Sequence, residues 1–509
     1  MQDPVAPFPA GPARGLAQDG LHLFRGLRYA LAPTGSRRWR PPEAHPDWSG
    51  VRDASRHGAA CPQPARRDGS LYAAPIPQQD EDCLNLSIWA PEGGRDLPVL
   101  VWLHGGSLIW GAGSEGIYDG AALARRGTVV VSVNYRLGVL GYLAHPELGA
   151  ESPAGVSGNY GLLDQIEALR WVQRNIAAVG GDPANVTVAG ESAGALSVLY
   201  LLATPAARGL FAKAVAQSAY LVSTPALRHS VHGHPAAEAD GLRMMQAVGA
   251  TDLAALRAID ARTLPTAALT AGFLPSGTVD GHVLPDQPLT LFEQGHGAPV
   301  PLLIGSNSGE LRSLPFLVPP LPSTAADYEA TIRLRYGDLA DEFLRLYPST
   351  ALRDSTEAAI RDALYGWTAH KLARCRPALP TYLYYFDHGY PEADARDLHA
   401  FHASEIPYLF DTAGAVPPNW PPMPAGEAGL TRQIGDYWAS FARCGQPLAE
   451  GAPDWPAHGA QGLGLHIAET PRVAGNLLPG YDLADAVIRR RRARGDQPWL
   501  ANHGVAAPL

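Results

Sequence analysis

Residues 185–203, NVTVAGESAGALSVLYLLA, decide the fold class of this chain. NVTVAG (185–190) predicts a short buried strand, and the apolar residues after it predict a helix. Between them, Gly190-Glu191-Ser192-Ala193-Gly194 fits G-x-S-x-G, in which small residues let strand and helix approach closely around one serine. Such a turn exposes the hydroxyl above a sheet and directs the helix N-terminus toward it. We therefore predict that Ser192 is a nucleophile; the alternative is a tight turn with only a structural role.

The rest of the chain repeats this alternation of strand and helix. Apolar runs that end in glycines or turns alternate with segments of helical periodicity, which is typical of an α/β protein with a central, mostly parallel sheet flanked by helices. No flexible linker divides the chain, so we expect a single domain over residues 1–509, with large helical and loop insertions at about 220–300 and 310–380. Further strands are predicted at 97–106, 128–138, 211–219, 299–307 and 381–388, and further helices at 159–181 and 481–494.

A glycine-rich turn follows the strand that begins at residue 97. His104-Gly105-Gly106-Ser107 places glycines where backbone N–H groups can turn toward a substrate oxygen without a Cβ in the way. Together with the N–H of Ala193, this turn predicts an oxyanion hole. A plain glycine-rich strand exit is the alternative for the motif taken alone.

The residues by themselves leave the general base and the acid open. A base should follow the last strand, and His399 and His402 both lie just after 381–388. The acid should follow an earlier strand. Glu310 comes after PLLIGSNSG, while Asp280 and Asp286 compete with it on spacing.

Composition excludes several functional classes. The net charge is −9, from 40 Lys and Arg against 49 Asp and Glu, so no basic field exists to hold nucleic acid. No run of 18 apolar residues occurs, so we expect no membrane span. The N-terminus of the supplied chain lacks the pattern of a signal peptide. The protein is therefore expected in the cytoplasm, or in the periplasm or outside the cell if a leader was removed.

Several blocks of sequence resemble the type-B carboxylesterases, a family with the α/β-hydrolase fold that includes bacterial p-nitrobenzyl esterases, animal carboxylesterases and cholinesterases. The resemblance runs almost from end to end. Its most specific blocks are EDCLNLSIWAP (81–91) and GNYGLLDQIEALRWVQRNIAAVGGDPANVTVAGESAGA (158–195). HGGSLIWGAGSEGIYDG (104–120), NYRLGVLGYL (134–143), FHASEIPYLF (401–410) and YWASFARCGQP (437–447) extend it.

The resemblance implies a role for each candidate residue. Ser192 becomes the nucleophile, Glu310 the acid and His402 the base, while His399 becomes a structural or rim residue. The backbone amides of Gly106, Ser107 and Ala193 become the oxyanion donors. The chain departs from the family pattern at Ser107, which replaces a glycine or alanine. It also departs on both sides of Glu310, where Gly309 and Leu311 replace the aspartate and glycine that usually flank the acid.

The resemblance also implies a disulfide between Cys61 and Cys83, which would favour export. Cys375 and Cys444 have no implied partner and are expected to be free thiols.

The expected function is hydrolysis of carboxylic esters through an acyl-enzyme intermediate, with no metal or cofactor and with a small-molecule ester as substrate; the oligomeric state is left open. Three alternatives are open. The first is an esterase specialised for polycarboxylate diesters, such as the side chains of some mycotoxins cleaved by bacterial relatives; Arg312, two residues beyond Glu310, is then a candidate for substrate binding. The others are a thioesterase or amidase, and a non-catalytic binding protein of the same fold.

Overall fold

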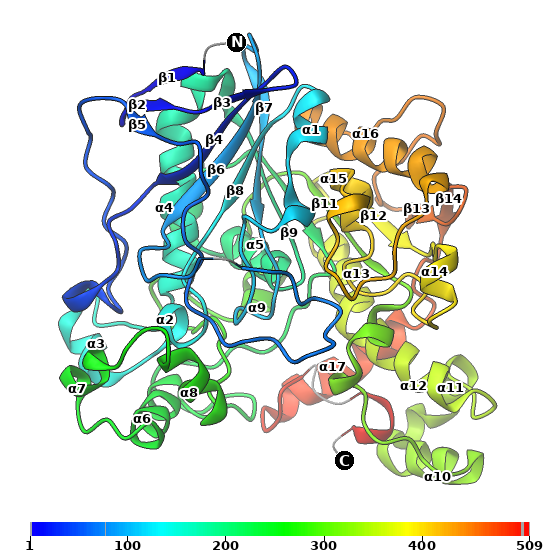
Figure 1. Ribbon diagram of the computed structural model, residues 1–509. Helices are drawn as coiled ribbons and strands as arrows, with labels where there is room; N and C mark the ends of the chain where they lie inside the picture. Colours follow the sequence, from blue (N-terminus) through cyan, green and yellow to red (C-terminus); the bar gives the residue numbers. More distant parts are fainter. Residues whose placement is uncertain (1–2, 77, 500–502, 508–509) are drawn as a thin grey trace.

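The apolar runs of the sequence form the centre of an eleven-stranded sheet in the computed structural model, which describes residues 3–76, 78–499 and 503–507 (Figure 1). The strand order is β14-β13-β12-β11-β10-β9-β7-β8-β6-β4-β3. The central strands from β13 to β8 are parallel, and both edges are antiparallel. The strands are β3 (Leu16–Gln18), β4 (Leu21–Arg28), β6 (Asn85–Pro91), β7 (Leu97–Leu103), β8 (Val129–Val133), β9 (Gly181–Glu191), β10 (Lys213–Gln217), β11 (Leu302–Asn307), β12 (Thr381–Phe386), β13 (Leu463–Ile467) and β14 (Arg472–Gly475).

The predicted mostly parallel sheet is therefore confirmed, and each predicted strand coincides with an observed one. The antiparallel strands at the two edges were not predicted from the sequence, because polar residues interrupt the apolar run in β4 and β6, and β3 and β14 are short. A separate small sheet contains β1 (Val5–Phe8), β2 (Gly11–Arg14) and β5 (Arg52–Asp53).

Helices cover both faces of the large sheet (Figure 1). Along β7, Val99, Val101 and Leu103 belong to one core cluster, and Leu100 and Trp102 to the other, because alternate side chains of a strand point to opposite faces. The first cluster includes residues of α2 (Gly138–Tyr142), α4 (Tyr160–Asn175), α5 (Ala193–Ala203), α9 (Pro288–Glu293), α13 (Trp367–Cys375) and α17 (Tyr481–Arg494). The second includes residues of α1 (Ala121–Arg125), α14 (Pro391–Asp394), α15 (Ile406–Phe410) and α16 (Ala428–Cys444).

The two regions expected as insertions are helical and rich in loops. Figure 1 shows them as separate groups of helices at the lower left and lower right of the view. The first region forms a cavity of about 450 Å³ whose lining includes Val222, Met244 and Phe273. The remaining helices are α3 (Pro146–Glu151), α6 (Ala237–Ala247), α7 (Leu253–Ala258), α8 (Leu264–Thr270), α10 (Ala325–Tyr336), α11 (Ala340–Leu346) and α12 (Leu352–Arg361). No helix in the described segments has both the length and the apolarity needed to cross a bilayer.

The predicted disulfide is wrong, because Cys61 and Cys83 are both free thiols in the structure. They lie in the main core, 2% and 0% exposed, and pack as small apolar groups. The Cys61 sulfur accepts a hydrogen bond from the N–H of Leu137, at 3.3 Å. A hydrogen bond with Cys61 and burial raise the pKa of the Cys83 thiol, which disfavours the thiolate that disulfide formation requires. Cys375 and Cys444 are free, as predicted.

Candidate active site

Ser192 lies at a strained turn between β9 and α5. Its backbone has φ +55° and ψ −121°, a conformation that residues other than glycine rarely adopt. The turn needs glycine on both sides: a Cβ on Gly190 would lie 2.5 Å from the carbonyl carbon of Gly194, and a Cβ on Gly194 would lie 2.0 Å from the carbonyl oxygen of Leu103. The sequence G-x-S-x-G therefore specifies this geometry locally. Ser192 itself is 8% exposed, and its Oγ forms no hydrogen bond with the residues that the structure describes.

Three backbone N–H groups near Ser192 are free to bind a substrate oxygen. Those of Gly106, Ser107 and Ala193 donate to no acceptor in the described part of the chain. Gly106 and Ser107 have φ of +107° and +59°, and they form a tight turn in which the N–H of Trp110 donates to the carbonyl of Gly106. Gly105 lies so close to the serine that a Cβ there would be 3.2 Å from Ser192 Cβ. Unpaired N–H groups beside a serine are the kind of donors that can bind an oxyanion.

The structure brings His402 and Glu310 together. Nδ1 of His402 hydrogen-bonds to Oε2 of Glu310, which is 0% exposed. The other oxygen of Glu310 accepts hydrogen bonds from Ser218 Oγ at 2.6 Å and from the N–H of Asn307 at 2.9 Å. The carboxylate is thus fixed from three sides, and it holds the proton of the imidazole on Nδ1, so that in the neutral ring the lone pair is on Nε2.

The competing residues lie elsewhere. His399 directs its two ring nitrogens at Asp394 and Asp387, at 2.8 and 3.2 Å. Asp280 accepts three backbone N–H groups of its own turn, and Asp286 accepts the N–H of Gln287. The structure therefore leaves Glu310 as the carboxylate at Nδ1 of His402. Arg312 is also engaged, because it forms ion pairs with two aspartates, Asp397 and Asp354.

A second carboxylate lies beside the imidazole of His402, and the sequence analysis did not predict it. Oε1 of Glu191, the residue before the serine, lies 3.1 Å from Nε2 of His402. Burial, reinforced by the nearby Glu405 and Glu310, raises the pKa of Glu191 to about 8 despite the charge of His402. Burial lowers the pKa of His402, but Glu191 and Glu310 outweigh it and raise that pKa to about 9. The pattern G-x-S-x-G leaves this position open, so spacing gave no signal for Glu191.

Comparison with known proteins shows to which family the chain belongs. The model of the carboxylesterase family matches residues 2–478. The chain is 37% identical to the fumonisin B1 esterase of Sphingopyxis macrogoltabida, over 88% of this chain and 83% of that protein. It is 36% identical to the para-nitrobenzyl esterase of Bacillus subtilis, over 88% and 91%. A solved structure of PNB esterase superposes with a TM-score of 0.81 at 31% identity, covering 95% of this chain and 99% of the other. The α/β-hydrolase fold is therefore confirmed, the protein is a carboxylic-ester hydrolase, and the chain belongs to the carboxylesterase family.

Proposed function

We propose that this hydrolase cleaves small carboxylic esters through an acyl-enzyme formed on Ser192, with His402 as base and Glu310 as its carboxylate partner. The observations that carry the proposal are a strained serine with unpaired N–H groups beside it, and an imidazole that is held by a buried glutamate and lies 3.1 Å from Glu191, the residue before the serine.

Each group has a defined task in this mechanism. Ser192 Oγ attacks the ester carbonyl while Nε2 of His402 takes its proton, and the oxygen that becomes negative binds the N–H groups of Gly106, Ser107 and Ala193. The imidazolium then gives its proton to the departing alcohol, which leaves an acyl-serine. Water, activated in the same way by His402, releases the acid and restores the serine. Glu310 stabilises the imidazolium in both halves of the cycle.

Substitution and active-site labelling test this proposal. Ser192→Ala and His402→Ala should each lower kcat for p-nitrophenyl butyrate by roughly 10⁴-fold or more, and Glu310→Gln by roughly 10²- to 10⁴-fold. A fluorophosphonate should label Ser192, as located by peptide mass spectrometry. His399→Ala is the control and should keep most of the activity. Full activity of the Ser192→Ala variant, or a label on another serine, would disprove the mechanism. A panel of thioesters and amides, compared by kcat/KM, separates the alternative leaving groups.

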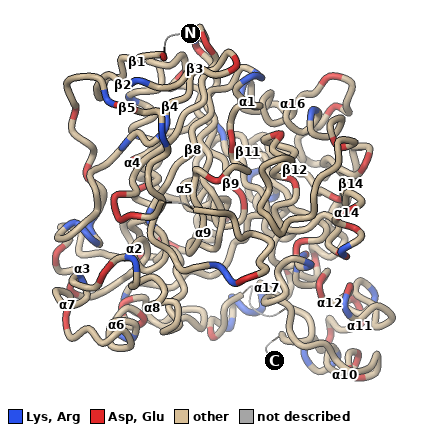
Figure 2. Tube along the Cα trace, viewed as in Figure 1, with Lys and Arg blue, Asp and Glu red and all other residues tan. Residues whose placement is uncertain are grey.

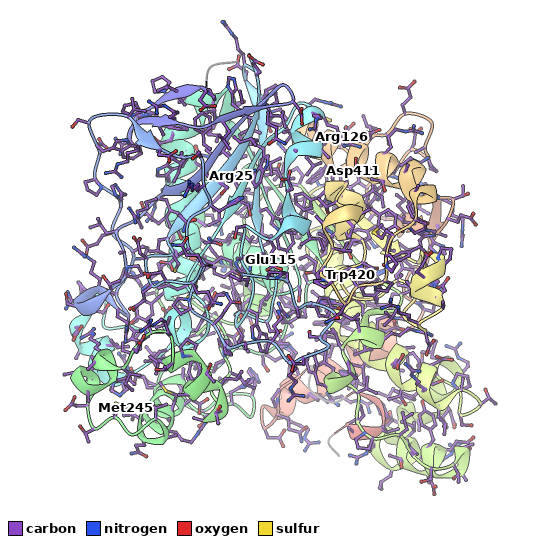
Figure 3. All side chains as sticks on the ribbon, viewed as in Figure 1. Arg25, Glu115, Arg126, Met245, Asp411 and Trp420 are labelled. Atoms are coloured by element: carbon purple, nitrogen blue, oxygen red, sulfur yellow. The ribbon has the colours of Figure 1, made fainter. Side chains whose placement is uncertain are left out.

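Arg66 favours a second candidate function, the hydrolysis of esters that carry free carboxylates, such as polycarboxylate diesters. Its guanidinium lies over the ring of Trp110, 5.4 Å from the centroid. The backbone N–H of Trp110 donates a hydrogen bond to the carbonyl of Gly106, one of the proposed oxyanion residues. Within the described residues, Arg66 has neither an ion pair nor a hydrogen bond. Burial lowers the pKa of its guanidinium, and the nearby Glu115, labelled in Figure 3, offsets this only in part. A half-buried guanidinium that forms no hydrogen bond or ion pair within the described residues suits an anionic group of a substrate.

Paired substrates test this candidate. Arg66→Gln should lower kcat/KM for the p-nitrophenyl monoester of succinate by about 10-fold, because one charge-assisted contact is lost, and leave p-nitrophenyl butyrate unchanged. Arg67→Gln, an exposed neighbour, is the matched control. An equal effect of Arg66→Gln on both substrates would refute recognition of the carboxylate.

A further inference from the structure

The backbone of His402 is held on both sides by side-chain hydroxyl groups that lie far away in the sequence. Its N–H donates to Ser313 Oγ at 3.2 Å, and its carbonyl accepts from Tyr72 Oη at 2.9 Å. The two hydroxyl oxygens are themselves 2.7 Å apart. Tyr72 is 330 positions from His402 in the chain, and Ser313 is 89.

The donors and acceptors permit a closed ring of three hydrogen bonds. The carbonyl oxygen of His402 can only accept, so the single hydroxyl proton of Tyr72 is directed to it. The N–H of His402 can only donate, so it uses a lone pair of Ser313 Oγ. The hydroxyl proton of Ser313 can then go to Tyr72 Oη, at 2.7 Å, in preference to the carbonyl oxygen of Glu310, at 3.5 Å, and all three donors have acceptors. Tyr72, Ser313 and the peptide groups of His402 together make up this His402 ring.

The loop that carries His402 is strained beside this residue, so hydrogen bonds to its backbone are needed to hold it in place. Ala403, the next residue, has φ +66°, a strained conformation for a residue with a Cβ. The end of β11 holds the preceding part of the loop: the N–H of Gly309 donates to Ala400, and the side chain of Asn307 to Phe401, both at 2.9 Å. The peptide groups of His402 itself are bonded only to Ser313 and Tyr72 among the described residues.

Tyr72 also contacts the imidazole through its own ring. The ring centroids of Tyr72 and His402 are 6.3 Å apart, with the planes at 78°. The ring of Trp420, labelled in Figure 3, also packs edge-to-face with that of Tyr72, with the centroids 5.8 Å apart and the planes at 87°. The phenol is therefore fixed by packing, so its hydroxyl has little freedom to leave the carbonyl of His402.

We propose that Tyr72 and Ser313 are positioning residues that fix the backbone of His402, and through it the direction of Nε2 toward Ser192. The inference rests on the proposed function, in which His402 is the base. Neither hydroxyl touches the reacting atoms. Loss of one should therefore lower the rate of proton transfer and leave substrate binding intact.

Removal of single hydroxyl groups tests the proposal. Tyr72→Phe and Ser313→Ala should each lower kcat for p-nitrophenyl butyrate by roughly 5- to 20-fold, with KM changed less than two-fold, since a small misplacement of a catalytic group costs rate rather than binding. The double variant should be no slower than the slower single variant, because one opened ring cannot be opened again. Ser313→Thr keeps a hydroxyl group and should retain most of the rate.

Tyr328→Phe is the matched control, because its hydroxyl also donates to a backbone carbonyl, that of Tyr347 at 3.0 Å, in the separate cluster around α10. It should leave kcat unchanged. Unaltered kcat in Tyr72→Phe, a rise in KM in place of a fall in kcat, or losses that multiply in the double variant would overturn the proposal. His402→Ala separates the two levels: an active His402→Ala variant refutes the proposed function, whereas an inactive one beside a fully active Tyr72→Phe refutes only the His402 ring.

Discussion

At the scale of single residues, the charge around His402 decides its proton affinity. Two carboxylates face the two nitrogens of one buried imidazole, Glu310 at Nδ1 and Glu191 at Nε2. Both favour the imidazolium, and together they outweigh the burial that disfavours it. His402 and Glu191 therefore titrate as a coupled pair rather than as two independent groups.

Removal of one charge should move the pH dependence of the enzyme. In the proposed mechanism the neutral imidazole is the base, so kcat/KM should rise with pH and reach half of its maximum near the raised pKa of His402, about 9. In Glu191→Gln the imidazolium loses one stabilising charge, its pKa falls, and the rising limb should move to lower pH by about one unit. Initial rates from pH 5 to 10 provide the measurement. An unmoved limb, or one displaced to higher pH, contradicts the electrostatic assignment.

At the scale of elements, the junction of β9 and α5 depends on the absence of a side chain. Gly194 lets the first turn of α5 lie against the end of β7, so that Ser192 is fixed by backbone packing on both sides. Because this close approach demands glycine at a fixed position, a local sequence pattern could predict the turn.

Gly194→Ala should therefore be severely destabilising. The added Cβ would lie 2.0 Å from the carbonyl of Leu103, so β7 and α5 must separate, at a cost of about 3 kcal/mol. Gly429→Ala, in α16 with no atom within 4 Å of the added group, is the control and should be neutral or slightly stabilising. Denaturant unfolding of the two variants gives the comparison. Equal stability would mean that the turn tolerates a Cβ.

A buried ion pair fixes α4 to the segment after β8. Arg136 and Asp164 are joined by two side-chain hydrogen bonds of 2.7 Å, and their side chains are 2% and 0% exposed. The guanidinium keeps a charge in the core only because this carboxylate compensates it.

Asp164→Asn leaves that charge uncompensated and should lower the free energy of unfolding by roughly 3–5 kcal/mol. The exposed pair of Arg333 and Asp341 supplies a contrast: Asp341→Asn should change stability by less than about 1 kcal/mol. Thermal and urea unfolding measure both. A loss for Asp164→Asn as small as that for Asp341→Asn would show that water or another group compensates Arg136.

At the scale of the whole molecule, stability comes from packing on the two faces of one large sheet rather than from covalent cross-links. In Figure 2, acidic and basic residues are interspersed along most of the trace; the run of arginines at 489–492, near the end of α17, is an exception. The four cysteines are all free, and two of them contribute to the larger core cluster as apolar groups.

Thiol titration should accordingly find four thiols per chain after denaturation without reductant. Reductant should leave Tm unchanged, because no loop of the unfolded chain is closed by a disulfide. A count of two thiols, together with a Tm that falls on reduction, would contradict this and show that Cys61 and Cys83 form a disulfide.

The sequence alone determined the features that depend on neighbouring residues. The strand, turn and helix around Ser192, the glycine turn at 104–107 and the parallel central strands follow from local spacing and continuous apolar runs. The edge strands could not be predicted in the same way, because their pairing depends on which strands lie beside them. The state of Cys61 and Cys83 was mispredicted, because the resemblance to other proteins does not fix the packing around two sulfurs in this core.

Tertiary structure alone decided which groups meet at His402. The residues left His399 and His402 open, and only the path of the loop after β12 brings His402 to Glu310 while it directs His399 at Asp387 and Asp394. Tyr72 and Glu191 were not predicted at all. A hydrogen bond between residues hundreds of positions apart leaves no periodicity in a sequence, because its geometry exists only after the elements that carry the two groups have packed together.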